Sequence, residues 1–184
     1  MRNNWLMRFM PVPVALASSV GEVRVGGAPA QPGAALSEGQ QIETGANGSA
    51  VLALADGSRV KVPPSSLAEI VASRAPGANE AQASRLASDG WFAGTMRMLR
   101  GSVEVLAAKL RRGPPLEVTT PTAVVGVRGT QYRVALDEDN GATRSEVLDG
   151  KVRLESPQRR AGAEIPAGFG AAIDASAKKP EPVK

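Results

Sequence analysis

The chain has 184 residues, a length that suits one domain or at most two small ones. It contains neither cysteine nor histidine, which excludes disulfide bonds, Cys/His zinc sites, thiol nucleophiles, and catalytic triads or proton shuttles that need imidazole. Lys and Arg number 22 and Asp and Glu 18, so the formal net charge is +4. A hydrophobic share of 42% argues against a disordered chain, and 20 glycines with 14 prolines predict many short elements joined by tight turns.

Residues 1–19 leave two interpretations open. An apolar run over 9–17 that ends in Ala-Leu-Ala, after a basic stretch, is typical of a weak secretory signal. Arg8 interrupts that run and Pro11 and Pro13 break it, which favours an extended linker. Because no stretch reaches the ~18–20 apolar residues of a membrane helix, the sequence predicts no transmembrane segment.

A short phrase with period-2 alternation recurs along the chain. Its copies are GEVRV (21–25), GSRVKV (57–62), GSVEVL (101–106) and GKVRLE (150–155). Glycine supplies a turn, valine suits a half-buried strand, and the charged residue between valines faces water. The copies are too short and unevenly spaced for a true repeat, and they predict hairpins packed on one core.

Turn residues between alternating runs predict three hairpins. The turns are Asp56-Gly57 within 52–62, the polar cluster 137–141 with Asn140-Gly141 within 132–148, and Asp149-Gly150 within 145–155. A further turn is predicted at 44–49, and Pro63-Pro64 ends the strand after the first hairpin.

The predicted fold class is all-β. We expect ten or more short, antiparallel strands in wrapped, solenoid-like or sandwich sheets, with at most one short helix, at 80–87. The segment 175–184 is rich in Pro, Lys and Glu and predicts a disordered tail. The predicted division is a linker or signal-like segment (1–19), one β domain (20–174) and the tail (175–184).

The run TPTAVVGVRGTQYRVAL (120–136) is the most specific stretch of the sequence. It resembles the signature of the FecR-type domain, a periplasmic module, in which T-P-x-A-x-x-x-V-R-G-T is followed by an aromatic residue. The matching positions are Thr120, Pro121, Ala123, Val127, Arg128, Gly129, Thr130 and Tyr132. Segments 36–70, 98–106, 146–157 and 165–174 resemble further strands of the family in the same order, so the resemblance covers about residues 20–174.

Many bacterial members of this family carry a peptidoglycan-binding LysM module ahead of the FecR-type domain. Residues 4–25 resemble the linker between the two modules, which favours a linker over a signal peptide at 1–19. The resemblance therefore implies a LysM-associated FecR-type domain without its LysM module. The founding sensor of the family also has a cytoplasmic anti-sigma segment and a membrane helix, which this sequence does not show, so the domain carries over rather than the whole signalling function.

Arg128 is the most interesting candidate within the signature. Simple alternation gives it the same parity as Tyr132 and points it at the core, where an unpaired charge costs several kcal/mol. Either Gly126 or Gly129 marks a bulge that flips the face, or Arg128 is paired with a carboxylate and main-chain carbonyls. A role for Arg128 in binding a partner is the functional alternative to these two structural explanations. The interaction or structural candidates are Arg128, Gly129, Thr130 and Tyr132.

The other motifs in the sequence do not indicate a nucleic-acid, metal or catalytic site. GVRG (126–129) matches a G-x-x-G nucleic-acid clamp, but both of its flanks alternate as strands, so we expect no nucleic acid. The acids of 137–141 lack the spacing of a calcium loop, and the carboxylate pairs lie at turns. We therefore predict no metal, no cofactor and no catalytic residues, and the protein is not expected to be an enzyme.

Two basic clusters admit either a solubilising face or attraction to anionic cell-wall polymer. They are Arg97, Arg100, Lys109, Arg111 and Arg112, and Lys151, Arg153, Arg159 and Arg160. The predicted function is a non-catalytic module, periplasmic or cell-envelope associated, that binds another envelope protein in surface sensing or signal regulation. The alternative is a structural module associated with peptidoglycan. The sequence leaves the export route open.

Overall fold

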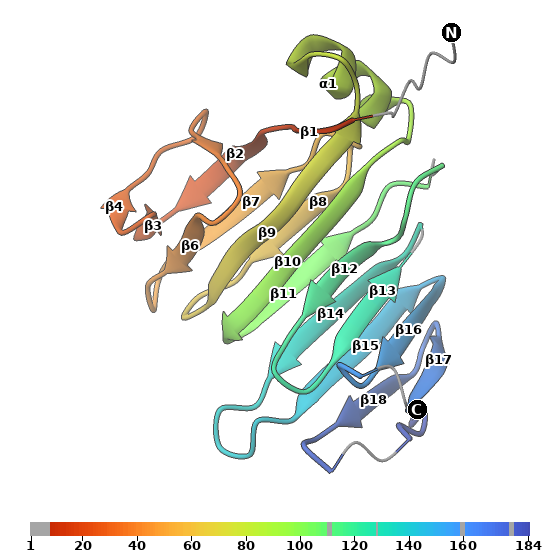
Figure 1. Ribbon diagram of the computed structural model, residues 1–184. Coiled ribbons are helices and arrows are strands. Elements are labelled where there is room, and N and C mark those ends of the chain that lie inside the picture. Colours follow the sequence, from red (N-terminus) through yellow and green to blue (C-terminus); the bar gives the residue numbers. More distant parts are fainter. Residues whose placement is uncertain (1–7, 110–111, 128, 159–160, 177–178) are drawn as a thin grey trace, which may run out of the picture.

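Two large sheets form the body of the protein in the computed structural model, which describes residues 8–109, 112–127, 129–158, 161–176 and 179–184 (Figure 1). Sheet A contains β1 (Phe9–Pro11), β3 (Val23–Val25), β4 (Ala28–Pro29), β6 (Gln41–Thr44), β9 (Leu67–Pro76), β10 (Ala93–Arg100), β12 (Leu116–Thr119), β13 (Val124–Val127), β16 (Lys151–Glu155) and β17 (Gly162–Pro166). Sheet B contains β2 (Val14–Val20), β5 (Ala35–Leu36), β7 (Ser49–Ala53), β8 (Arg59–Val62), β11 (Ser102–Leu106), β14 (Gln131–Leu136), β15 (Thr143–Asp149) and β18 (Gly170–Ile173).

The strand order shows how the chain builds both sheets together. Sheet A runs β17-β16-β13-β12-β10-β9-β6-β3-β4, with β1 beside β9, and sheet B runs β18-β15-β14-β11-β8-β7-β2-β5. From β7 onward the chain adds one or two strands to one sheet, crosses to the other and adds the next, so strand numbers rise steadily along both sheets. Neighbouring strands are antiparallel except for β10 and β12, which run parallel. The predicted all-β class with at most one short helix is confirmed, because the described part of the chain forms two large sheets and one helix.

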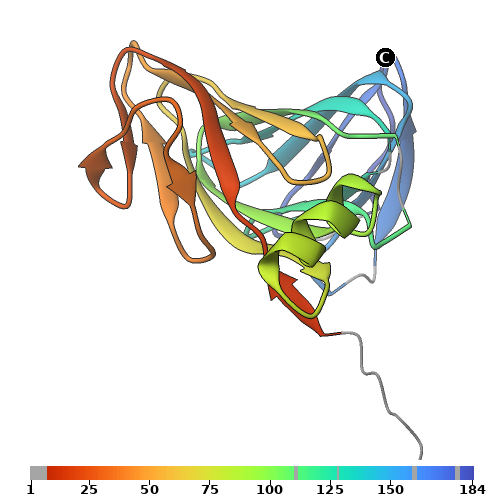
Figure 2. The same ribbon diagram turned by 90° about the horizontal axis from the view of Figure 1, so that it is seen from above.

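The core lies between the two sheets, which stack face to face (Figure 2). Alternation produces it directly: in β8, Val60 and Val62 are fully buried while Arg59 and Lys61 face water. Burying a valine contributes roughly 1.5–3 kcal/mol, and each charged neighbour keeps its hydration. Tyr132 of β14 is the largest fully buried side chain among the described residues.

The helix α1 (Glu80–Ser88) lies beside β1 and β9, across the ends of the strands (Figure 2). It confirms the predicted helix at 80–87. Asn79 begins it, because its side-chain Oδ1 accepts a hydrogen bond of 2.9 Å from the Gln82 N–H, as at a helix N-cap. Ala83 and Ala87 form its buried face. No helix in the described ranges has the length and apolar character needed to span a membrane.

Two of the three predicted hairpins are confirmed. β7 pairs with β8 around Asp56-Gly57, and β14 pairs with β15 around 137–141. The strand β8 ends immediately before Pro63, as predicted. The third hairpin, at Asp149-Gly150, is wrong: β15 pairs with β14 and β18 in sheet B, whereas β16 pairs with β13 and β17 in sheet A.

Gly150 instead occupies a corner, by which we mean a point where the chain passes from one sheet to the other. Positive φ angles mark many of these corners among the described residues, including Gly21 (64°), Gly101 (77°), Gly129 (60°), Gly150 (80°) and Gly168 (80°). Glycine adopts these angles without the steric penalty of a Cβ. Of the four glycines that begin the recurring phrase, Gly57 alone lies in a hairpin, and the other three lie at corners.

Both ends of the described chain join the sheets. Within the predicted segment 1–19, the strand β1 pairs with β9 and most of β2 pairs with β5 and β7. Within the predicted tail 175–184, Val183 forms a bridge with Gly170 of β18. The proposed limits of the domain remain a prediction.

Candidate functional site

The signature stretch 120–136 crosses from sheet A to sheet B at Gly129. Arg128 lies outside the described residues. In β13, Val125 and Val127 are buried, whereas in β14 the buried positions are Tyr132 and Val134. The residues of β13 that join the main core are thus odd-numbered and those of β14 are even-numbered, so simple alternation does not run unbroken from β13 into β14. The face does flip near Gly129, but through a corner between sheets rather than a bulge within one strand.

Gly129 and Thr130 lie against neighbouring parts of the fold. A Cβ on Gly129, whose φ is 60°, would lie 3.3 Å from the Cα of Lys109. Thr130 is 1% exposed; its Oγ1 donates a hydrogen bond of 3.0 Å to the Lys151 carbonyl, and its own carbonyl accepts one of 2.9 Å from Ala107 N–H. Thr130 therefore links the corner to β16 and to the end of β11.

Tyr132 lies under the outer surface of sheet B. Its neighbours in register are Val105 on β11 and Val147 on β15, and its side chain is fully buried. Such a side chain buries about 150–250 Å² and dominates local packing. The structure thus gives Gly129, Thr130 and Tyr132 structural positions, while a role for them in binding a partner remains a prediction.

Two exposed leucines cover the outer face of sheet B close to this corner. Leu106 at the end of β11 is 53% exposed and Leu148 near the end of β15 is 55% exposed. Gln131 of β14 lies between them, in register with Leu106 on one side and with Asp149 on the other. We call Leu106, Gln131 and Leu148 the leucine patch. With strands about 4.8 Å apart, its two leucines stand roughly 10 Å from each other across the sheet.

Sequence reasoning missed the leucine patch although a signal was present. In GSVEVL (101–106) Val103 and Val105 point inward, so Leu106 follows Glu104 in the outward register. A large apolar residue in an outward position of an alternating strand is a deviation from the pattern that builds the core.

A row of alternating charges borders the leucine patch on the same face. Lys61, Glu104, Arg133 and Glu146 lie in register on β8, β11, β14 and β15. Arg133 forms ion pairs of 3.6 Å with both Glu104 and Glu146. These pairs neutralise most of the charge of the row. What distinguishes this end of sheet B is therefore its two exposed apolar side chains, together with exposed Arg59, which lies in register beside Leu106.

The predicted basic clusters carry less free charge than their composition indicates. Arg97 lies 3.7 Å from Glu69, Arg100 3.0 Å from Glu43, and Arg153 2.6 Å from Glu155. Lys109, Arg112 and Lys151 are exposed. Arg111, Arg159 and Arg160 lie outside the described residues.

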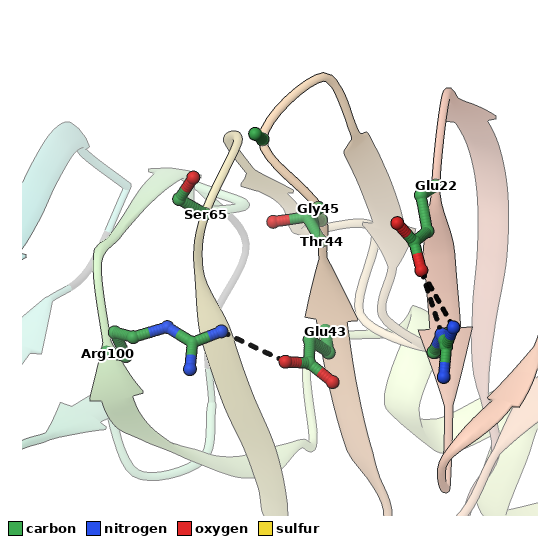
Figure 3. Close-up of a pocket in the computed structure, with 8 residues that line it drawn as sticks. Glu22, Glu43, Thr44, Gly45, Ser65 and Arg100 are labelled. Carbon is green, nitrogen blue, oxygen red and sulfur yellow. Dashed lines mark hydrogen bonds and ion pairs between the residues drawn. The ribbon is translucent and has the colours of Figure 1, made fainter.

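A shallow pocket of about 410 Å³ opens over β3, β6 and the end of β10 in sheet A (Figure 3). Its lining residues are Glu22, Arg24, Glu43, Thr44, Gly45, Ala46, Ser65 and Arg100. Arg24 pairs with Glu22 at 2.9 Å and Arg100 with Glu43 at 3.0 Å, so its acids and arginines already neutralise one another (Figure 3). Within the described residues, no group of three or more Asp and Glu side chains is arranged to hold a metal ion.

Comparison with known proteins adds a family and a fold. The family model described as "FecR protein" matches residues 40–153. Two solved structures, both named as a "putative anti-sigma factor" from Parabacteroides distasonis ATCC 8503, at 2.50 Å and 1.65 Å resolution, share 17% sequence identity with this chain at a TM-score of 0.57. Each comparison covers 78% of this chain and 59% of the solved one. Because the sequence identity is so low, the likeness concerns the fold alone. None of the curated proteins matches the chain.

Proposed function

Since the chain belongs to the FecR protein family, a family of envelope-associated regulators, we propose that it is a non-catalytic module that regulates signalling by binding another envelope protein. The signature stretch of that family forms the corner at Gly129 and the strand β14 inside sheet B, between β11 and β15. We assign the contact with the partner to the leucine patch, which lies on the outer face of sheet B above this strand.

The exposure of Leu106 and Leu148 is the observation that carries the proposal. Both are more than half exposed on strands whose other outward residues are mostly polar or charged. Removing such side chains from water on binding contributes about 25 cal/mol per Å² of apolar surface. The backbone of Leu106 is held in sheet B on both sides, by Arg59 of β8 and Gln131 of β14, whereas Leu148 lies at a register shift between β14 and β15. The Leu106 half of the patch is therefore presented rigidly, and its binding costs little ordering entropy.

The surroundings of the leucine patch are positively charged, so the partner should carry negative charge. The cations are Arg59 beside Leu106, and exposed Lys109 and Lys151 near the corner. A partner surface with an apolar centre and carboxylates at its rim complements this arrangement. The peptidoglycan alternative gains no support from the comparisons, and pairing of Arg97, Arg100 and Arg153 with carboxylates removes much of the cationic surface it needs.

Site-specific photo-crosslinking in the native host tests the proposal. A crosslinking residue at position 148 should capture one discrete envelope protein, whereas the same residue in place of Leu99, 37% exposed on the outer face of sheet A, should not. L148E should abolish the crosslink placed at position 106 and the signalling output that the module regulates, with the melting temperature unchanged. Equal capture from positions 99 and 148, or full output in L148E, would refute the proposed function.

A further inference from the structure

The segment 179–183 lies against the last strand of sheet B. The Val183 N–H donates a hydrogen bond of 2.7 Å to the Gly170 carbonyl, and the Gly170 N–H donates one of 2.8 Å to the Val183 carbonyl. Pro180 is buried, and the chain ends beside β17 and β18 (Figure 1). This segment therefore occupies the edge at which another strand would otherwise add to sheet B.

The free edge of β18 is defined by the alternation of its hydrogen bonds. The Phe169 carbonyl accepts a hydrogen bond from Val147 on β15, so the odd-numbered residues bond to β15 and the even-numbered ones, Gly170 and Ala172, point outward. Gly170 is taken by Val183. Within the described ranges, no main-chain bond fills the outward groups of Ala172.

The segment holds its place with few contacts. Surface hollows of about 590 and 600 Å³ flank it, one toward Arg153 and β17 and the other toward Ala172 and Ser176. Val183 is 67% exposed. Pro180 and Pro182 lack an N–H, so the segment cannot offer a regular outer edge to a further strand. The segment thus covers the edge of β18 and prevents a further strand from adding to sheet B.

We propose that the segment 179–183 is a displaceable cover, and that without it two copies of the chain pair through their β18 edges as a twofold dimer. Antiparallel pairing centred on Ala171 places Gly170 of each copy opposite Ala172 of the other and satisfies the outward groups of both strands. The inference is independent of the leucine patch, whose residues belong to β11, β14 and β15 rather than to β18.

A second copy fits this edge better than head-to-tail growth does. At the opposite end of sheet B, β5 pairs with β2 at Val14 and Ala15. Leu16 of β2 donates to the Ala34 carbonyl and accepts from Gly33. The edge strand at that end, β5, has only two residues, against four in β18, so an incoming β18 pairs over a longer stretch with another β18.

Sedimentation equilibrium on matched variants of the full chain tests the cover. V183P removes the N–H that bonds Gly170, whereas V183A keeps both main-chain bonds and trims an exposed side chain. We expect V183P, and a chain without residues 179–184, to lower the dimer dissociation constant about tenfold or more relative to V183A and the natural chain. If both stay as monomeric as V183A, the proposal is wrong.

A second variant distinguishes strand pairing from nonspecific aggregation. A172P removes the outward N–H, and an edge strand tolerates proline there because that N–H is not bonded to β15. Added to the shortened chain, it should restore the monomer without lowering the melting temperature. A synthetic peptide of residues 179–184 should also dissociate the dimer. A dimer that survives both A172P and the peptide would overturn the proposal.

Discussion

Thr130 and Lys151 connect the two sheets at the family signature. The Thr130 Oγ1 lies 3.0 Å from the Lys151 carbonyl oxygen, with Thr130 just before β14 in sheet B and Lys151 at the start of β16 in sheet A. Because Thr130 is 1% exposed, water has little access to replace this bond. The threonine of the signature therefore acts as a link between layers.

Replacing Thr130 tests this link. T130V keeps the shape but removes the hydroxyl, which leaves the Lys151 carbonyl without that donor, and should lower the free energy of unfolding by about 1–3 kcal/mol. T130S retains the hydroxyl and should cost only about 1 kcal/mol for the lost methyl group. Urea denaturation at neutral pH measures both. Equal losses in the two variants would show that the hydroxyl is not what stabilises the corner.

Gly150 and Gly168 form a matched pair of corners. Both have φ of 80°, but a Cβ on Gly150 would lie 2.8 Å from Thr130 Oγ1, whereas one on Gly168 meets nothing within 4 Å. G168A should cost about 1–2 kcal/mol for the left-handed backbone alone. G150A should cost about 1–3 kcal/mol more, since the Thr130 contact must shift. Thermal unfolding compares them, and the prediction fails if the two losses are the same.

Asp149 and Gly150 show why the sequence predicts where strands lie better than it predicts which strands pair with each other. Alternation around Asp149-Gly150 correctly indicates a strand on each side, because valine and charge alternate wherever one face is buried. A hairpin turn and a corner between sheets both need a positive φ, and Asp-Gly supplies it in either case. Which sheet receives the next strand depends on long-range pairing, such as β16 with β13, that no local pattern encodes.

The candidate site was predictable only in part, for a related reason. The signature stretch was recognised from Thr120 to Tyr132, but parity alone could not show that the chain changes sheet at Gly129, with Val127 buried before the corner and Tyr132 buried after it. The leucine patch combines Leu106 and Leu148, which are 42 positions apart in sequence and become neighbours only because β11 and β15 flank β14. Periodicity assigns each one to an outward face but cannot place them together.

Glu38 gives a prediction about pH. Two hydrogen bonds from the Arg74 guanidinium, of 2.7 and 2.8 Å, hold the pKa of Glu38 below its usual value, against partial burial, with help from the Ser73 N–H at 3.0 Å. Because the folded-state pKa is depressed, the stabilisation is present above the unfolded pKa of about 4.3 and is lost as the pH falls through the lower folded value.

The test compares the pH dependence of the free energy of unfolding between about pH 7 and pH 3. E38Q should lose less stability on acidification than the natural chain, because its amide does not titrate. R74Q should also flatten the profile, since it removes the largest cause of the pKa shift and leaves only the Ser73 N–H. Profiles of E38Q and the natural chain that run parallel over the whole range would contradict the assignment.

Thr143 and Ser145 on β15 supply a final matched pair of buried hydroxyls. The Thr143 Oγ1 lies 2.5 Å from Thr120 Oγ1 and 2.8 Å from Thr122 Oγ1, which joins β15 to the turn between β12 and β13. The Ser145 Oγ, two residues along on the same face, has no hydrogen-bond partner among the described residues. T143V should therefore cost about 1–3 kcal/mol by breaking a buried network. S145A removes a hydroxyl that gains nothing from burial and should be neutral or stabilising. Chemical denaturation of the two variants decides the matter, and an S145A loss as large as that of T143V would show that the Ser145 hydroxyl is bonded in solution.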